Sequence, residues 1–285
     1  MPRSVHLLIV DPQNDFCDLP EAYLPTDPLT GNPCQPALPV AGAHADMQRL
    51  ARFIDATAHA LTSITVTLDS HHRLDVAHPT FWRTGDGQPV APFTPITAAE
   101  VRAGAFHPRH IDDLPRTLTY LDELEARGRY TLMVWPVHCE IGTWGHNVHA
   151  DVRAAYSRWE DADQFIVRKV PKGTNPWTEH YSALMAEVPD PDDPRSQLNR
   201  SLLGSLDRSD LIIIGGEAGS HCVRATVEHL AEHLPGGNLS RIVLLTDCMS
   251  PVAGFTDAQA TFLQRMRDLG MQERTSVDMA RALHA

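Results

Sequence analysis

The sequence predicts an α/β protein with a three-layer, doubly wound, mostly parallel sheet covered by helices on both faces. Short runs rich in Val, Ile and Leu alternate along the chain with helical patterns. The apolar runs are continuous, which is typical of strands that are buried on both faces. Repeated strand–helix units favour a parallel sheet, and 285 residues are enough for one large domain.

The expected elements follow one another in a regular order. Strands are expected at residues 5–10, 64–68, 130–135, 164–167, 211–214 and 242–245, and helices at 43–61, 114–127, 144–159, 176–186, 222–234 and 256–269. Segments near residues 17–40, 83–110 and 187–195 have little periodicity and are rich in turn-forming residues, so we expect loop insertions there, within a single domain over residues 1–285. Ligands of such sheets bind beyond the carboxyl ends of the strands, which is where we look for functional residues.

Composition narrows the class of protein. The formal net charge is −12 and no block of Lys or Arg occurs, so a nucleic-acid partner is not expected. No apolar stretch approaches the roughly 20 residues of a membrane helix, and the first apolar run is too short for a signal peptide. We therefore expect a cytoplasmic protein without a membrane partner, whose five cysteines are free thiols.

The first expected strand ends at Asp11, which is followed by a proline. A carboxylate at the rim of a sheet is partly shielded from water, and this shielding raises its pKa and suits it to proton transfer. An aspartate that begins a loop before proline would have the same local sequence. From this segment alone the two interpretations have equal weight.

The next two strand ends carry candidate metal ligands. Asp69 and His71 point to the same side of an extended backbone, because side chains two residues apart lie on one face. Together with His138, they would offer three ligands of the kind that Zn²⁺, Fe²⁺ or Mn²⁺ accepts. By itself an Asp-x-His pair is a weak signal in a chain with 16 histidines. We interpret the nearby Cys139 as a packing residue. We interpret His146 and His149 as a solvated pair on one helix face.

The last two strand ends carry a lysine and a cysteine. Lys172 precedes a glycine at a strand end, although most lysines are simply surface residues. Cys222 follows a glycine-rich turn and begins an amphipathic helix. A helix N-terminus favours the reactive thiolate, and its free N–H groups can stabilise an oxyanion. A buried structural cysteine is the competing interpretation, and position alone favours the nucleophile by a small margin.

Taken together, these motifs resemble those of the isochorismatase-like cysteine hydrolases and, within them, of the nicotinamidases. They occur in the family's order and span nearly the whole chain: Asp11-x-Gln-Asn-Asp-Phe16, Asp69-x-His71, Trp135-Pro-x-His138-Cys, Lys172-Gly and Gly-x-Ala-x-x-x-Cys222-Val-x-x-Thr226. Five ordered motifs are far more specific than any one of them. The resemblance implies the isochorismatase-like hydrolase fold.

The resemblance also implies a role for each matching residue. Asp11 corresponds to the general base and acid, Lys172 to the lysine of the triad and Cys222 to the nucleophile. The other implied roles are metal ligands (Asp69, His71 and His138), oxyanion-binding N–H groups (Ala218 and Cys222), aromatic walls around the substrate (Phe16 and Trp135) and a cis peptide bond (Glu217–Ala218). His78 lies near the position of a further histidine ligand in some members, with slightly different spacing.

The activity that the resemblance implies is hydrolysis of nicotinamide to nicotinate and ammonia through a thioester, as part of NAD salvage. One divalent transition metal, zinc before iron or manganese, would be the cofactor, and a small amide the partner. Alternatives are an amidase for another amide or carbamoyl substrate, an isochorismatase, and a catalytically silent binding protein. Glu217, Gly219 and Ser220 depart from the family pattern, so the substrate is less defined than the triad. The sequence is compatible with a homo-oligomer and does not specify one.

Overall fold

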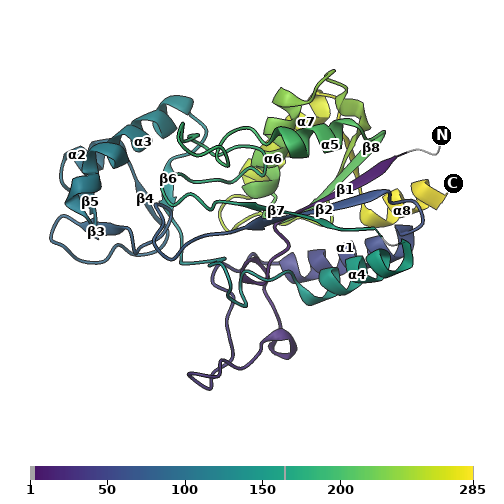
Figure 1. Cartoon of the computed structure of the whole chain (residues 1–285), viewed down its shortest axis with the longest axis horizontal. Coiled ribbons are helices and arrows are strands. Elements are labelled where there is room, and N and C mark those ends of the chain that lie inside the picture. The colour runs from purple at the N-terminus through teal and green to yellow at the C-terminus, as the bar shows by residue number, and fades with distance from the viewer. Residues whose placement is uncertain (1–3, 164, 285) are drawn as a thin grey trace.

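The protein is built around a six-stranded, fully parallel sheet. The computed structural model describes residues 4–163 and 165–284, and the strand order of this sheet is β10-β9-β8-β1-β2-β7 (Figure 1). Its strands are β1 (Val5–Val10), β2 (Ser63–Asp69), β7 (Arg168–Lys172), β8 (Leu211–Gly216), β9 (Ile242–Leu245) and β10 (Gln272–Arg274). The predicted fold class is therefore confirmed.

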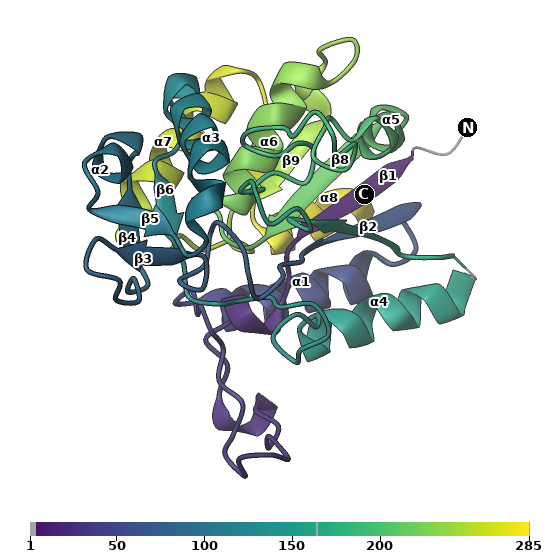
Figure 2. The same cartoon turned by 60° about the vertical axis from the view of Figure 1, so that its left-hand side comes forward.

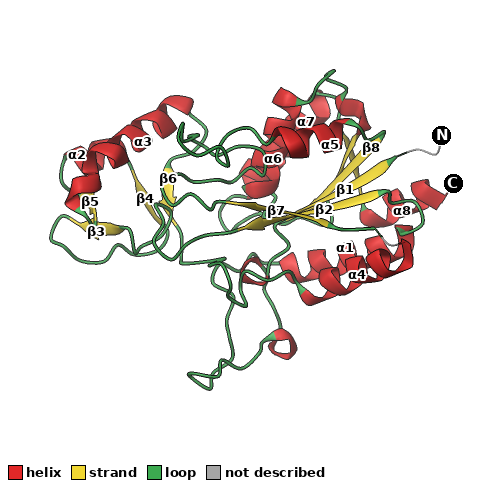
Figure 3. Ribbon diagram, viewed as in Figure 1, coloured by secondary structure: helices red, strands yellow, loops and turns green. Residues whose placement is uncertain are grey.

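Helices cover both faces of the sheet and complete the three layers (Figures 1 and 3). One face is covered by α1 (Ala43–Thr57), α4 (Ala150–Asp163) and α8 (Ser276–His284), and the other by α5 (Arg200–Asp207), α6 (Cys222–His233) and α7 (Thr256–Asp268). The side chains of β1 alternate between the two cores: Leu8 and Val10 belong to the core under α6, and Leu7 and Ile9 to the core under α1. Because both faces are buried, such strands occur in the sequence as continuous apolar runs.

A smaller body, the lateral lobe (residues 76–134), lies beside the central sheet (Figure 2). It contains β3 (Trp82–Thr84), β4 (Thr94–Ile96), α2 (Ala98–Arg102), β5 (Phe106–Pro108), α3 (Leu114–Arg127) and β6 (Leu132–Val134). β3 pairs with β5 and β4 with β6, both antiparallel, over a buried cluster of their own. The strand expected at 130–135 is thus β6, and the prediction that it joins the central sheet is wrong. Three-residue strands are too short to show periodicity, which is why residues 83–110 indicated only a loop.

The fourth central strand lies later in the chain than the sequence predicted. This strand is β7, at Arg168–Lys172, whereas the sequence predicted it at residues 164–167. Of that predicted range, Gln164 lies outside the described residues. β7 is an edge strand, paired on one side only, so it tolerates charged residues and Pro171. The apolar pattern that marks the central strands is therefore missing here.

Three expected helices are absent or shorter than predicted, and α1, expected at 43–61, ends at Thr57. Residues 176–186 form turns and bends, in which Thr178 Oγ1 donates to the Val188 carbonyl oxygen at 2.7 Å. Local bonds of this kind compete with helical ones, so the helix prediction is wrong here. The helix expected at 144–159 begins only at Ala150, because the carbonyl groups of Gly145 and Asn147 accept bonds from the loop after β1 instead.

The remaining segments are largely irregular. Residues 17–40 project from the body (Figure 2), and residues 187–195 consist of turns and bends. The short 3-10 helices are Asn14–Phe16, Glu21–Tyr23, Ile111–Asp113 and Leu239–Arg241. Within residues 4–163 and 165–284, no helix has the length and apolar character that crossing a membrane requires.

Candidate active site

Four segments that are far apart in the sequence end at one edge of the central sheet. β1 lies between β8 and β2, and β7 lies on the other side of β2. Asp11 directly follows β1, and Asp69 and Lys172 end β2 and β7 in register with each other. Cys222 begins α6 after β8. Because the carboxyl ends of parallel strands meet at the same edge, the topology brings these side chains together.

Lys172 is the centre of the cluster. Its Nζ lies 2.9 Å from Asp11 Oδ2 and 3.6 Å from Cys222 Sγ. It also contacts Asp69 Oδ1 and the carbonyl oxygen of His180, each at 2.9 Å. The side chains of all these partners are buried. A buried charge is costly unless it is paired, and here one ammonium group is shared by two carboxylates.

The surroundings change the protonation of the three groups. Burial raises the pKa of Asp11 above its ordinary value, and the Lys172 ammonium opposes this only in part. Burial disfavours the charge on Lys172 as well, but Asp11 and Asp69 outweigh it and raise the pKa of the lysine well above its usual range. Burial also raises the pKa of the Cys222 thiol well above its usual value. The thiol is therefore favoured over the thiolate that a helix terminus alone would favour, and a nucleophilic role for Cys222 would require a neighbouring base.

Asp11 is fixed by a residue that the sequence analysis missed. Thr67 Oγ1, in β2, donates to Asp11 Oδ1 at 2.6 Å and accepts from the Asp11 N–H group at 3.0 Å. These bonds hold the carboxylate with Oδ2 against Lys172. Threonine is common in strands, so nothing in the sequence of β2 singled out Thr67.

The turn between β8 and α6 presents two unbonded N–H groups. The peptide bond between Glu217 and Ala218 is cis, as the resemblance implies. Gly216 has a φ of 126°, and a Cβ there would lie 2.0 Å from the Val10 carbonyl oxygen, so β1 and β8 approach closely only because this residue is glycine. Among the described residues, no hydrogen bond uses the N–H group of Ala218 or Cys222. Both are available to a negative charge that develops on a substrate.

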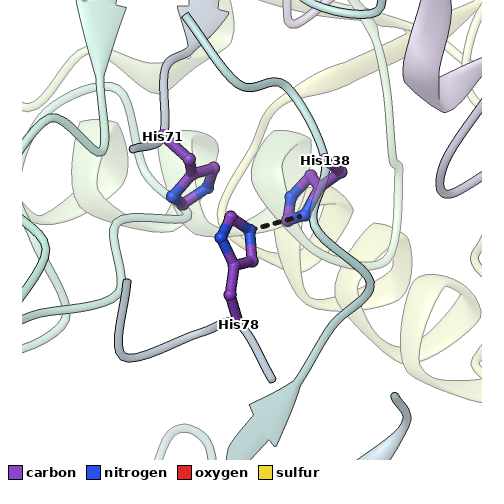
Figure 4. A group of neighbouring side chains, drawn as sticks. All are labelled: His71, His78 and His138. Carbon is purple, nitrogen blue, oxygen red and sulfur yellow. Dashed lines mark hydrogen bonds between the residues drawn. The ribbon is translucent and has the colours of Figure 1, made fainter. Parts of the chain in front are cut away.

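Three buried histidines cluster beside these groups (Figure 4). One possible ligand atom from each of His71, His78 and His138 lies within 4.8 Å of the other two. The Oδ2 atom of Asp69 adjoins the cluster, 3.1 Å from His71 Nε2 and 3.3 Å from His138 Nε2. The sequence analysis grouped Asp69 with His71 and His138 and left His78 open, and the structure places His78 in the cluster.

The second nitrogen of each ring is engaged by an oxygen atom that accepts hydrogen bonds. The Nδ1 atom of His71 lies 3.0 Å from Asp75 Oδ2. The Nδ1 atom of His78 lies 3.2 Å from the His72 carbonyl oxygen, and that of His138 lies 2.8 Å from the Pro136 carbonyl oxygen. A proton on Nδ1 leaves a lone pair on Nε2 for a metal ion, which is the arrangement usual for metal-binding histidines. Burial disfavours a charge on His71, but Asp69 and Asp75 outweigh it and raise the pKa of this ring well above its usual value, so a metal ion would have to displace a proton there. Burial and the neighbouring histidines lower the pKa of His78 to about 2, so this ring is neutral. The residues present thus fit a divalent transition metal.

A narrow pocket opens onto Cys222. Phe16 and Trp135, the two residues expected to contact substrate, both line it, together with Ala218. Its free volume is about 20 Å³, about enough for one water molecule. A ring-sized substrate therefore needs side chains of the wall to move.

The sequence analysis missed five further pocket residues, of which three have polar side chains: Glu179, Tyr181 and His221. Trp135 Nε1 donates to Tyr181 Oη at 3.0 Å, and the His221 ring lies edge-on to Trp135 at 5.3 Å. Burial lowers the pKa of His221 to about 4, so its imidazole is neutral near pH 7. Glu179 and Tyr181 lie in the segment wrongly expected to be a helix, and the only signal for His221 was its position next to Cys222.

Other candidate residues lie outside this cluster. The Nζ atom of Lys169 lies over the Tyr156 ring, 4.9 Å from its centroid. Neither His146 nor His149 belongs to a helix, and His149 is fully buried with its Nε2 2.9 Å from His44 Nδ1, so the prediction of a solvated helical pair is wrong. Cys139 is buried in the core.

Glu217, the most unusual departure from the family pattern, does not face the pocket. It is fully buried and its Oε2 accepts from the Ser250 N–H group at 3.2 Å. In this position the carboxyl group neither contacts a substrate in the pocket nor points into solvent.

The fold matches those of several solved structures. A yeast nicotinamidase has a TM-score of 0.60 and 19% identity over 94% of this chain and 98% of that one. A Pyrococcus horikoshii pyrazinamidase in complex with zinc has a TM-score of 0.51 and 17% identity over 95% of this chain and 99% of that one. An isochorismatase-like hydrolase from Alkaliphilus metalliredigens has a TM-score of 0.53 and 12% identity over 98% of each chain. No protein-family model and no curated protein matches the chain. The likeness confirms the isochorismatase-like hydrolase fold.

Proposed function

We propose that the protein is a cysteine amidohydrolase of the nicotinamidase kind, which hydrolyses nicotinamide to nicotinate and ammonia. The observation that supports this most directly is the contact of one buried ammonium group, on Lys172, with both Asp11 and Cys222, at 2.9 and 3.6 Å. A thiol, a carboxylate and a counter-charge in one buried cluster are the groups that acyl transfer to cysteine requires.

The first half of the proposed reaction forms a thioester. Asp11 takes the proton of the Cys222 thiol, and burial makes this carboxylate a stronger base than an exposed one. Lys172 and the N-terminus of α6 stabilise the thiolate, which attacks the amide carbonyl carbon. The N–H groups of Ala218 and Cys222 hold the oxyanion. Asp11 then protonates the amide nitrogen, the C–N bond breaks and ammonia leaves.

The second half hydrolyses the thioester. Asp11 takes a proton from a water molecule, and the resulting hydroxyl group adds to the thioester carbonyl carbon at the same oxyanion-binding groups. The C–S bond breaks, the acid leaves, and the sulfur of Cys222 recovers its proton from Asp11. The same carboxylate therefore acts twice as base and twice as acid.

The histidine cluster supports a metal cofactor, with zinc preferred to iron or manganese. His71, His78 and His138 would hold the ion, with Asp69 beside them. When bound, it would supply a Lewis-acidic position for the ring nitrogen of a pyridine amide or for a water molecule. Phe16 and Trp135 would flank the planar ring of the substrate.

Ammonia release from a panel of amides tests the proposal. We expect kcat/KM for nicotinamide, and for pyrazinamide, to exceed that for benzamide by about tenfold or more, because benzamide has the ring but no ring nitrogen. Small aliphatic amides such as acetamide should be poorer still. Equal values for nicotinamide and benzamide would remove the role of the ring nitrogen. Turnover of aliphatic amides alone would indicate an amidase for another substrate, and no ammonia from any amide would reject the amidase proposal.

A further inference from the structure

Three residues other than glycine have a left-handed backbone among the described residues. They are Asp11, Phe93 and Cys139, with φ of 42°, 64° and 46°. This conformation is unfavourable for a residue with a Cβ atom, and where it persists it is often part of a functional site. Asp11 is the carboxylate of the candidate triad, and Cys139 directly follows His138 of the histidine cluster. Phe93 is the one whose role the proposed reaction leaves unexplained.

Phe93 lies in the lateral lobe, directly before β4. Its N–H group donates to the Val134 carbonyl oxygen at 2.6 Å, which ties its backbone to β6. Its ring lies edge-on to the indole of Trp135, with centroids 6.0 Å apart and planes at 87°. Phe93 is nevertheless 56% exposed. A ring that is more than half exposed gains little from hydrophobic burial, so burial does not explain why a bulky residue occupies this position.

The contact that Phe93 makes is with a residue of the pocket wall. The indole of Trp135 is tied on the pocket side by the hydrogen bond to Tyr181 and by the edge-on ring of His221. Phe93 adds a ring contact from the lateral lobe. Edge-to-face contact between aromatic rings is directional, so Phe93 restricts the orientation of the indole as well as its position.

We propose that Phe93 is a positioning residue that holds Trp135 in place and so favours flat aromatic amides over aliphatic ones. This inference rests on the proposed function, because it requires the substrate ring to pack against Trp135. Phe93 is not among the residues that line the pocket, so it acts through Trp135 and not on the reacting atoms. Its effect should therefore fall on KM for ring substrates and leave kcat unchanged.

Three variants separate the effect of the Phe93 ring from that of its backbone, and a fourth serves as a control. Phe93→Ala removes the ring, Phe93→Asn removes it but tolerates a left-handed backbone, and Phe93→Tyr restores it. Phe165→Ala is the matched control, because Phe165 is also partly exposed, at 46%, and packs on a tryptophan, Trp159, outside the pocket. We expect Phe93→Ala and Phe93→Asn to raise KM for nicotinamide about 3- to 10-fold, the worth of one aromatic contact, with kcat unchanged. In the same two variants, KM for an aliphatic amide should stay near the wild-type value. In Phe165→Ala and Phe93→Tyr, both kcat and KM should stay near the wild-type values.

The kinetic pattern decides the matter, with thermal unfolding as the check on folding. A wild-type KM for nicotinamide in Phe93→Asn, or an equal rise in KM for aromatic and aliphatic amides, would overturn the inference. If Phe93→Ala does not fold, the KM of Phe93→Asn alone decides. A wild-type protein without activity on any ring amide would reject the proposed substrate, and this inference with it. Normal wild-type activity on nicotinamide, unaffected by either substitution, would reject the role of Phe93 only.

Discussion

The two sides of the pocket supply different kinds of group. The sheet side, formed by the ends of β1, β7 and β8, carries Asp11, Lys172 and Cys222, which are buried and joined by short contacts between charged or ionisable atoms. The lobe side, formed by the lateral lobe and the segments on either side of it in the sequence, carries Trp135 and the histidine cluster, where the contacts are between rings. The difference suggests that bond breaking and substrate choice are controlled by separate parts of the chain.

The physical basis of this separation is the strength of the coupling on each side. On the sheet side, one ammonium group balances two buried carboxylates, so removing the ammonium group takes this counter-charge from both of them. On the lobe side, each ring contact contributes a small and largely independent amount. Substitutions on the sheet side should therefore act on turnover with every amide, and those on the lobe side should distinguish between amides.

The largest expected effect is loss of a sheet-side group. Cys222→Ala should abolish hydrolysis of all amides, and Asp11→Asn and Lys172→Ala should each lower kcat by about 10²- to 10⁴-fold. Lys169→Ala is the matched control and should retain wild-type kcat, since its ammonium group lies over Tyr156. Steady-state ammonia release measures these changes. An active Lys172→Ala variant beside an inactive Lys169→Ala variant would show that the wrong lysine has been assigned.

Loss of the histidine cluster should have the next largest effect. Elemental analysis of protein purified without added metal should find one transition metal ion per chain, and His71→Ala should lose it. His146→Ala should keep it, because His146 lies outside the cluster and bonds to Ser70 Oγ at 2.9 Å. The loss of activity should be greater with nicotinamide than with an aliphatic amide. A full complement of metal in a variant without His71, His78 and His138 would place the site elsewhere.

The sheet side was also the more predictable from sequence. Asp11 directly follows one continuous apolar run, and Cys222 lies one turn beyond another. The topology of a parallel sheet brings such strand ends together whatever the loops do. Lys172 was assigned to the triad from the Lys-Gly motif, even though its strand was predicted too early in the sequence. Thr67, which fixes Asp11, had no signal of its own.

The lobe side depends on contacts that periodicity does not encode. Trp135 and His138 came from one motif, but β6 was assigned to the wrong sheet, since three-residue strands leave no pattern. Phe93 reaches the indole from a segment without periodicity in the sequence, and Tyr181 reaches it from a segment that was wrongly expected to be a helix. Which rings meet there is decided by tertiary packing, so the sequence alone did not place them.

The smallest expected effect concerns Glu217, a sheet-side carboxyl group that takes no part in the proposed chemistry. Burial raises its pKa well above the ordinary value, and the nearby Asp46 carboxylate raises it further. Because its folded-state pKa lies above the unfolded value of about 4.3, its stabilising contribution is complete at low pH and is lost as the pH rises through the folded-state pKa.

Glu217→Gln cannot ionise, so the variant should escape that loss. We expect its Tm to match wild type near pH 4 and to exceed it by about 2–4 °C in alkaline solution, the shift that about 1 kcal/mol produces in a protein of this size. Glu232→Gln, at an exposed position, should show no such pH-dependent difference. Thermal unfolding across pH measures both. The ratio of kcat/KM for nicotinamide to that for benzamide should stay unchanged, because Glu217 does not line the pocket. If that ratio shifts, a sheet-side residue controls substrate choice, and the division between the two sides of the pocket fails.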